Sequence, residues 1–213
     1  MEQRIVLAVS TVIFALRPHP ESGRATLWLP LVKRIREPYR GRWALPGGPL
    51  RAAEDLVASA RSTLARTAGL EPAHLEQLYS FGGLDRSPDR VVSIVYWALV
   101  RADEDAAAVD GENVAWFVAD EVPELAFDHG EIVAYALRRL RAKITYSDIA
   151  HAFTGDEFTL AQLREVHEAV RQVRLDPANF RRQALANPRI VPTGRHLTGT
   201  SHRPPAFYRL EHP

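Results

Sequence analysis

Cysteine is absent from the chain, and this absence excludes a disulfide framework, a thiol nucleophile and a cysteine-based zinc site. Long apolar runs of the kind that cross a membrane are absent as well, so no membrane-spanning helix is expected. The apolar segment from Ile5 to Leu16 follows Met1 to Arg4 without a small-residue cleavage site. It predicts a buried first strand rather than a signal peptide. We therefore expect a cytoplasmic protein without a cofactor or a membrane partner.

The net charge is also small: 27 Lys and Arg residues and 26 Asp and Glu residues give a formal charge of +1. The two ends of the chain differ, however. Residues 1–140 carry 16 basic and 19 acidic side chains, whereas residues 141–213 carry 11 basic and 7 acidic ones. This segregation indicates two parts with different partners, of which the basic part faces a polyanion. A chain of 213 residues with 46% hydrophobic residues can form one large domain or two small ones.

The most informative stretch of the first part begins with Arg42 to Leu45, which predicts a short strand. Pro46, Gly47 and Gly48 then predict a turn. A helix follows, since apolar residues recur every four positions at Leu56, Ala60, Leu64 and Ala68. Gly69 is expected to end this helix. A glycine turn that leads into a helix N-terminus is a suitable place for phosphate, because free backbone N–H groups point toward it.

A basic loop, Lys33 to Gly41, precedes this stretch. It is either a solvated surface loop or a source of cations for a nucleotide diphosphate. Further strands are predicted at residues 25–32, 78–82, 91–100 and 114–118. A helix is predicted from Asp128 to Lys143, with Ile132, Ala136, Leu137 and Leu140 toward the core.

The glycine stretch resembles the Nudix box, G-x5-E-x7-R-E-U-x-E-E-x-G-U with U apolar, in which Gly48, Glu54, Leu64, Gly69 and Leu70 fall in register. Three of the four glutamates are replaced, since Thr63, Arg66 and Thr67 stand in their places. In the family these carboxylates bind the divalent cations that activate water, and such hard cations need oxygen ligands. The resemblance therefore implies a Nudix fold that has lost hydrolysis, with no catalytic or metal-binding residue.

The C-terminal part predicts a winged helix-turn-helix. Thr159 is expected to cap one helix, which carries Leu160, Leu163, Val166 and Val170. Asp176 and Pro177 begin a second helix that ends near Ala186, with Phe180 and Leu185 on one side. Residues 190–192 and 206–210 are predicted to pair as strands around a loop of residues 193–205. The alternative is a helical subdomain whose arginines are only solvated.

Together the two parts resemble the NrtR family, the Nudix-related transcriptional regulators of NAD metabolism. The most specific motifs are residues 41–48, 155–160, 179–182, 192–194 and 204–209. The resemblance implies an α+β chain with a Nudix-like α/β/α sandwich at residues 1–145 and a winged helix-turn-helix at residues 146–213. It further implies a dimeric repressor of NAD biosynthesis or salvage genes that binds a palindromic operator in the nucleoid. A nucleotide such as ADP-ribose releases the operator, and some relatives instead regulate sugar catabolism.

Two sets of binding residues follow. The predicted DNA-binding residues are Asn179, Arg181, Arg182, Gln183, Thr193, Arg195, His196, Thr198, Ser201 and Arg203. The predicted effector-binding residues are Arg34, Arg36, Arg40, Gly47, Gly48, Glu54, Arg86 and Arg90. Asn and Arg are the residue types that hydrogen-bond adenine and guanine edges in pairs. The helix of residues 128–143 joins the two parts, and we expect it to transmit effector binding to the DNA-binding part.

Two other classes of protein remain open. One is a Nudix hydrolase, such as an ADP-ribose pyrophosphatase, with a relocated metal site that combines Glu54 with Asp85 or Glu131. The other is an adaptor whose winged helix contacts a protein instead of DNA.

Overall fold

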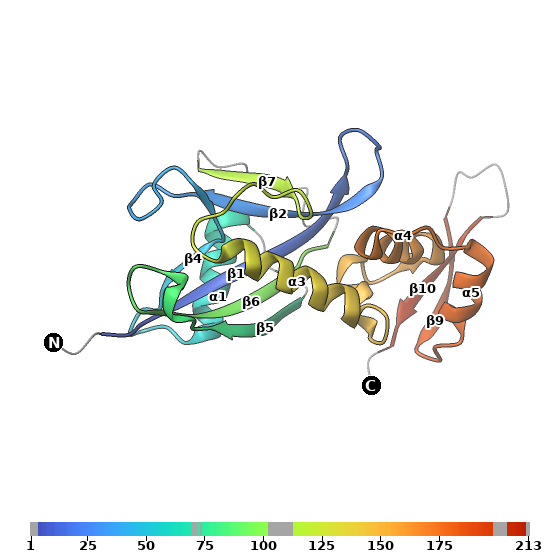
Figure 1. Cartoon of the computed structure of the whole chain (residues 1–213). Coiled ribbons are helices and arrows are strands. Elements are labelled where there is room, and N and C mark those ends of the chain that lie inside the picture. The colour runs from blue at the N-terminus through green and yellow to red at the C-terminus, as the bar shows by residue number, and fades with distance from the viewer. Residues whose placement is uncertain (1–3, 70–71, 73, 102–112, 198–203, 212–213) are drawn as a thin grey trace.

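The computed structural model of the protein describes residues 4–69, 72, 74–101, 113–197 and 204–211. In this part of the chain, a seven-stranded mixed sheet forms the first half, and a three-stranded sheet with short helices forms the second (Figure 1). The elements of the first half are β1 (Val6–Pro18), β2 (Ala25–Lys33), β3 (Trp43–Ala44), β4 (Gly47–Pro49), α1 (Leu56–Ala68), β5 (His74–Phe81), η1 (Leu84–Arg86), β6 (Val91–Leu99), β7 (Val114–Val118) and α3 (His129–Lys143).

Strand β1 lies at the centre of the large sheet, antiparallel to β2 and parallel to β6. Its side chains alternate between the two faces, as a strand requires. Ile13 packs with Leu64 of α1, whereas Phe14 belongs to the cluster that holds Ile132 of α3. The two helices therefore cover opposite faces of the sheet, and the predicted α/β/α arrangement is confirmed.

Gly47 and Gly48 lie in a strand, whereas the sequence predicts a turn before a helix at this point. Gly47 and Gly48 lie in β4 and pair with Ser10 and Val9 of β1. A Cβ atom at position 47 would lie 2.4 Å from the Val9 carbonyl oxygen, whereas one at position 48 would meet no atom within 4 Å. Close approach to β1, rather than an unusual backbone angle, is therefore the reason for a glycine at position 47.

Helix α1 begins well after the glycines, at Leu56, and a carboxylate already occupies its N-terminus. The side chain of Asp55 accepts a hydrogen bond of 2.7 Å from the backbone N–H of Ala58. The expectation that the glycines and this helix N-terminus form one phosphate cradle is therefore wrong. The predicted end is confirmed, because Gly69 adopts the left-handed conformation with φ of 67°.

The second half follows α3 directly. Its elements are η2 (Asp148–Phe153), β8 (Phe158–Thr159), α4 (Leu160–Arg171), α5 (Pro177–Leu185), β9 (Ile190–His196) and β10 (Ala206–Leu210). Thr159 and Gln162 form a reciprocal cap at the start of α4. Asp176 caps α5 by accepting a hydrogen bond from the Asn179 N–H, and Pro177 is its first residue. The two predicted helix starts are thus confirmed.

Several predicted bounds differ from the structure. Strand β5 begins at His74 rather than at residue 78, and β9 extends to His196, so residues 193–196 belong to a strand and not to the wing loop. The sequence did not indicate β8, which pairs with β10 through two residues. Leu185 is 40% exposed and does not share the buried side of Phe180.

One hydrophobic cluster crosses from the large sheet to the winged helix. It contains Phe14 and Leu29 of the sheet, Leu140 of α3, and Phe158 and Leu163 of the C-terminal part. If either part unfolded alone, the other would expose the apolar side chains that the two parts bury against each other. We therefore expect the two parts to unfold together. Among the described residues, no helix is both long enough and apolar enough to span a membrane.

Candidate functional sites

A cationic cavity of about 460 Å³ lies where β2, β3, β4 and α1 meet. Its charged lining residues are Lys33, Arg34, Arg36 and Arg66, and no carboxylate of the described residues lines it. Gly47 and Gly48 contribute backbone. A volume of this size suits a small-molecule ligand, and the uniform charge suits an anion.

The three positions of the Nudix box that have lost a glutamate line this cavity, as does Gly48 of the same box. Thr63, Arg66 and Thr67 of α1 line it, and they are the three residues that replace glutamates. Arg66 is held by its own helix, because its Nε donates to the Ser62 carbonyl oxygen at 3.2 Å and its Nη2 donates to Thr63 Oγ1 at 3.4 Å. The cavity wall is therefore cationic where a Nudix hydrolase carries metal-binding carboxylates.

The described residues do not fit a divalent cation. No group of three or more His, Cys, Asp or Glu side chains is positioned to hold a metal ion in this part of the chain. Glu54 lies outside the cavity lining and faces Arg51 at 3.4 Å. Asp85 and Glu131 are exposed and form no such group with Glu54. A relocated metal site built from these carboxylates has no structural support.

The structure brings half of the predicted effector-binding residues together. Arg34, Arg36, Gly47 and Gly48 line the cavity, whereas Arg40, Glu54, Arg86 and Arg90 do not. Sequence reasoning did not select Lys33, Thr63, Arg66 and Thr67. The three α1 residues could have been selected from the register of the Nudix box. They stand at the positions where the family carries its metal-binding carboxylates.

The guanidinium of Arg86 is committed to a buried ion pair. Its Nε and Nη2 donate to the two carboxylate oxygens of Asp128 at 2.8 and 2.7 Å, and its Nη1 donates to Ser93 Oγ at 2.9 Å. Only 6% of the Arg86 side chain is exposed. Arg90 donates to the Gly82 carbonyl oxygen at 2.9 Å. Arg86 therefore fixes the start of α3 to η1, outside the cationic cavity.

The loop of residues 34–42 is folded back on itself, and this positions Arg34. The backbone N–H of Arg34 donates to Arg42, and its Nε donates to the Pro38 carbonyl oxygen at 2.7 Å. The Arg34 guanidinium also lies 4.6 Å from the ring centroid of Phe127, within the range of a cation–π contact. One part of the basic loop is thus ordered at the cavity rather than merely solvated.

Helix α3 touches the wall of the cavity at its first residue. The Leu45 backbone N–H donates to Nδ1 of His129 at 2.9 Å, and Leu45 lines the cavity. Burial lowers the pKa of His129 to about 4, so the ring is neutral at pH 7 and its Nδ1 can accept this hydrogen bond. A rearrangement of residues 45–48 around a ligand would therefore change the contact between Leu45 and His129 and shift the start of α3.

The other end of α3 is attached to the winged helix. Arg141 Nε donates to the Val170 carbonyl oxygen of α4 at 2.9 Å, and its Nη2 donates to both carboxylate oxygens of Asp120 at 2.8 and 2.7 Å. Lys143 forms an ion pair with Glu76 of β5. Helix α3 thus connects the cavity to α4.

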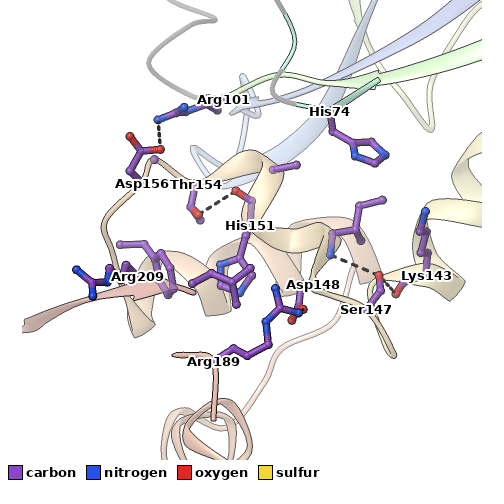
Figure 2. A pocket seen from close by; sticks show the side chains of 15 residues that line it. His74, Arg101, Lys143, Ser147, Asp148, His151, Thr154, Asp156, Arg189 and Arg209 are labelled. Atoms are coloured by element: carbon purple, nitrogen blue, oxygen red, sulfur yellow. Dashed lines mark hydrogen bonds and ion pairs between the residues drawn. The ribbon is translucent and has the colours of Figure 1, made fainter. Parts of the chain in front are cut away.

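A larger cavity of about 680 Å³ lies between the two halves, beside η2 and the end of α3. Figure 2 shows cationic and anionic side chains next to each other along its lining. Arg101 pairs with Asp156 at 3.1 Å, and Arg189 pairs with Asp148 at 2.6 Å. Arg101 and Asp156 thus join the two halves, whereas Arg189 and Asp148 both belong to the second half. Because carboxylates pair with these cations, less positive charge remains for an anionic ligand than in the first cavity.

The surface of α5 presents the predicted DNA-binding residues to solvent. Asn179, Arg181, Arg182 and Gln183 are all exposed, and Arg182 Nη2 donates to Asn179 Oδ1 at 2.6 Å. Phe180 on the other side is buried and lies 5.2 Å from the ring of His167 in α4. Figure 1 places α5 at the opposite end of the molecule from the loop of residues 34–42.

The strands beside α5 place only part of the predicted wing residues. Thr193 is half-buried, and its hydroxyl donates to the Phe207 carbonyl oxygen at 3.3 Å. Arg195 is exposed and pairs with Glu157 at 2.6 Å, and His196 is exposed. Thr198, Ser201 and Arg203 lie outside the described residues. To contact a DNA phosphate, Arg195 would therefore have to break its ion pair with Glu157.

Two family models match successive segments of the chain. Residues 8–138 match the model of the NUDIX domain, and residues 152–210 match that of the NrtR DNA-binding winged helix domain. The "ADPR responsive transcriptional repressor NtrR" of Acinetobacter baylyi is 28% identical over 211 residues, which cover 96% of this chain and 82% of that protein. The "ADP-ribose pyrophosphatase" of Methanocaldococcus jannaschii is 32% identical over 109 residues, or 51% of this chain and 64% of that enzyme.

Solved structures of Shewanella oneidensis NrtR are similar over nearly the whole length. The structure of that protein alone has a TM-score of 0.80 and 30% identity, and the match covers 97% of this chain and 94% of the other. Its complex with a 27mer DNA has a TM-score of 0.79 and 29% identity, with 96% and 93% covered. Its NUDIX domain complexed with ADP ribose has a TM-score of 0.52 and 28% identity, with 65% and 90% covered. The chain therefore belongs to the NrtR family, with a NUDIX domain followed by an NrtR winged helix DNA-binding domain.

Proposed function

We propose that this protein is a transcriptional repressor of NAD biosynthesis or salvage genes that ADP-ribose releases from its operator. Residues 1–145 sense the effector and residues 146–213 bind double-stranded DNA. The observation that carries the proposal is the cationic cavity of Lys33, Arg34, Arg36 and Arg66, which contains no carboxylate among its described lining residues. The repressor of Acinetobacter baylyi is described as ADPR responsive, the Shewanella relative has been crystallised with DNA, and its NUDIX domain has been crystallised with ADP ribose.

The protein acts as a homodimer at the nucleoid in this proposal. Two winged helices that bind a palindrome must lie about one helical turn of DNA, roughly 34–36 Å, apart. An effector that binds better to a dimer with another spacing lowers operator affinity by the ratio of its affinities for the two states. Helix α3 is the element that connects the two sites, because His129 touches Leu45 at the cavity and Arg141 touches Val170 of α4.

Hydrolysis is not part of the proposed function. The residues that replace the glutamates, Thr63, Arg66 and Thr67, remove the carboxylates that a Nudix hydrolase uses to bind cations. We expect no release of AMP from ADP-ribose in the presence of Mg²⁺ and Mn²⁺. AMP release that disappears in Glu54→Gln would instead support an enzyme with a different metal site.

The experiment that tests the proposal is a gel-shift titration with DNA from upstream of NAD-biosynthesis genes. It is carried out at two salt concentrations, with and without ADP-ribose, and with AMP and ribose 5-phosphate as controls. Specific binding should weaken as salt rises, because phosphate contacts release counterions, and it should be lost when ADP-ribose is added. Binding that persists in saturating ADP-ribose would refute the effector, and absence of DNA binding at both salt concentrations would refute the repressor.

A further inference from the structure

We propose that the cationic cavity binds the diphosphate of its effector without a divalent cation, and that the guanidinium of Arg66 takes the place of the metal. The inference rests on the proposed function, since it concerns how the same effector is held. It arises from a disagreement between the fold and the residues. A NUDIX domain implies a divalent cation at this helix, whereas the described residues offer it no cluster of ligands.

The orientation of Arg66 supports this role. Its contacts with Ser62 and Thr63 lie within its own helix and use one N–H of Nε and one of Nη2. A guanidinium has five N–H donors in a planar fork, so about three of them remain for a ligand. Phosphate oxygens are the acceptors that such a fork binds in pairs. The side chain is thus held in place and retains donors for a diphosphate.

The charge around Arg66 favours an anion over a cation. Lys33, Arg34 and Arg36 line the same cavity, and no described carboxylate lines it. A divalent cation there would be repelled by Arg66, and the described lining residues would offer it only hydroxyl and carbonyl oxygens as ligands. A diphosphate would be attracted by all four side chains. The larger cavity between the two halves differs, because its arginines Arg101, Arg189 and Arg209 already pair with carboxylates.

The test is calorimetric titration of the full-length protein with ADP-ribose, once in EDTA and once in millimolar Mg²⁺. The dissociation constants should agree within twofold. Arg66→Met should raise the dissociation constant at least tenfold under both conditions, and Arg66→Glu should raise it further because a carboxylate repels the diphosphate. Arg61→Met is the matched control, since Arg61 is exposed on the same helix and lies outside the cavity lining. It should bind like the wild type.

The outcomes separate this inference from the function on which it rests. Wild-type protein that binds ADP-ribose only with Mg²⁺ would overturn the metal-free cavity and leave the effector intact. Arg66→Met that binds as tightly as Arg61→Met would overturn the role of Arg66. Absence of binding under both conditions would overturn the effector and the inference together. Operator binding and the thermal midpoint of each variant are measured in parallel, and unchanged values show that the variant is folded.

Discussion

The ion pair between Arg86 and Asp128 allows the sharpest separation of a structural role from a ligand-binding one. Arg86 is one of the residues predicted to bind the effector, yet its side chain is only 6% exposed and that of Asp128 only 15%. Arg86→Met retains the apolar stem of the side chain and removes its charge. The carboxylate of Asp128 is then left buried without its partner at the start of α3.

The size of the effect follows from this burial. Removal of one partner from a buried ion pair costs about 3–5 kcal/mol, and the lost donor to Ser93 Oγ adds to that. Such a loss is a large part of the roughly 5–15 kcal/mol by which a typical native protein is stable. Arg86→Met combined with Asp128→Asn should cost less than Arg86→Met alone, because the uncompensated charge is then removed.

The assay is urea unfolding followed by tryptophan fluorescence. A single transition is expected, because one hydrophobic cluster spans both halves. Arg90→Met is the control, since Arg90 donates only to the Gly82 carbonyl oxygen at an exposed site and should cost at most about 1.5 kcal/mol. The reasoning is refuted if Arg86→Met unfolds like the wild type while its affinity for ADP-ribose falls tenfold.

Three further predictions concern pH, DNA and backbone packing. Burial lowers the pKa of His129 to about 4, so between about pH 6.5 and 4 the unfolded chain binds the proton that the folded chain excludes. His129 alone should lower stability by about 2 kcal/mol from pH 7 to pH 5, and His167, whose pKa burial also lowers to about 4, should add a similar share. Urea unfolding of His129→Gln that retains the full wild-type pH slope would contradict this. Arg182→Ala should weaken operator binding by about 1–3 kcal/mol in a gel shift, whereas Arg61→Ala should not, and equal affinities would mean that another face of α5 meets the DNA. Gly47→Ala should lower the free energy of unfolding by about 1–3 kcal/mol, because its Cβ would lie 2.4 Å from the Val9 carbonyl oxygen; Gly48→Ala, which meets no atom within 4 Å, should be near wild type in the same urea titration.

The sequence predicts local features of the fold well where a few neighbouring residues determine them. Thr159 with Gln162 and Asp176 with Pro177 cap their helices as predicted, because capping depends on residues within one turn. Gly69 ends α1 for the same reason. The register of the Nudix box also identified the α1 positions that face the cavity, although their replacement by Thr and Arg kept them out of the predicted site.

Features set by long-range pairing were not predictable in this way. Gly47 reads as a turn residue, but its partner is Ser10 of β1, which lies far away in the sequence. Strand β8 consists of two residues and exists through its pairing with β10. Arg86 and Asp128 are 42 positions apart, so no local pattern indicates that the arginine is neutralised. An arginine near a predicted ligand site is therefore a candidate until its carboxylate partners are known.

The central claim is that an anionic effector in the cationic cavity controls DNA binding at the other end of α3. Fluorescence anisotropy tests it most directly, with a labelled duplex that the wild-type protein has selected from a random-sequence pool and with ADP-ribose added in EDTA. We expect ADP-ribose to release the duplex from the wild type and from Arg61→Met. Arg66→Met should bind the duplex with wild-type affinity and remain bound at the same ADP-ribose concentration. Release of Arg66→Met at the wild-type effector concentration, or a wild type that ADP-ribose does not release, would contradict the claim.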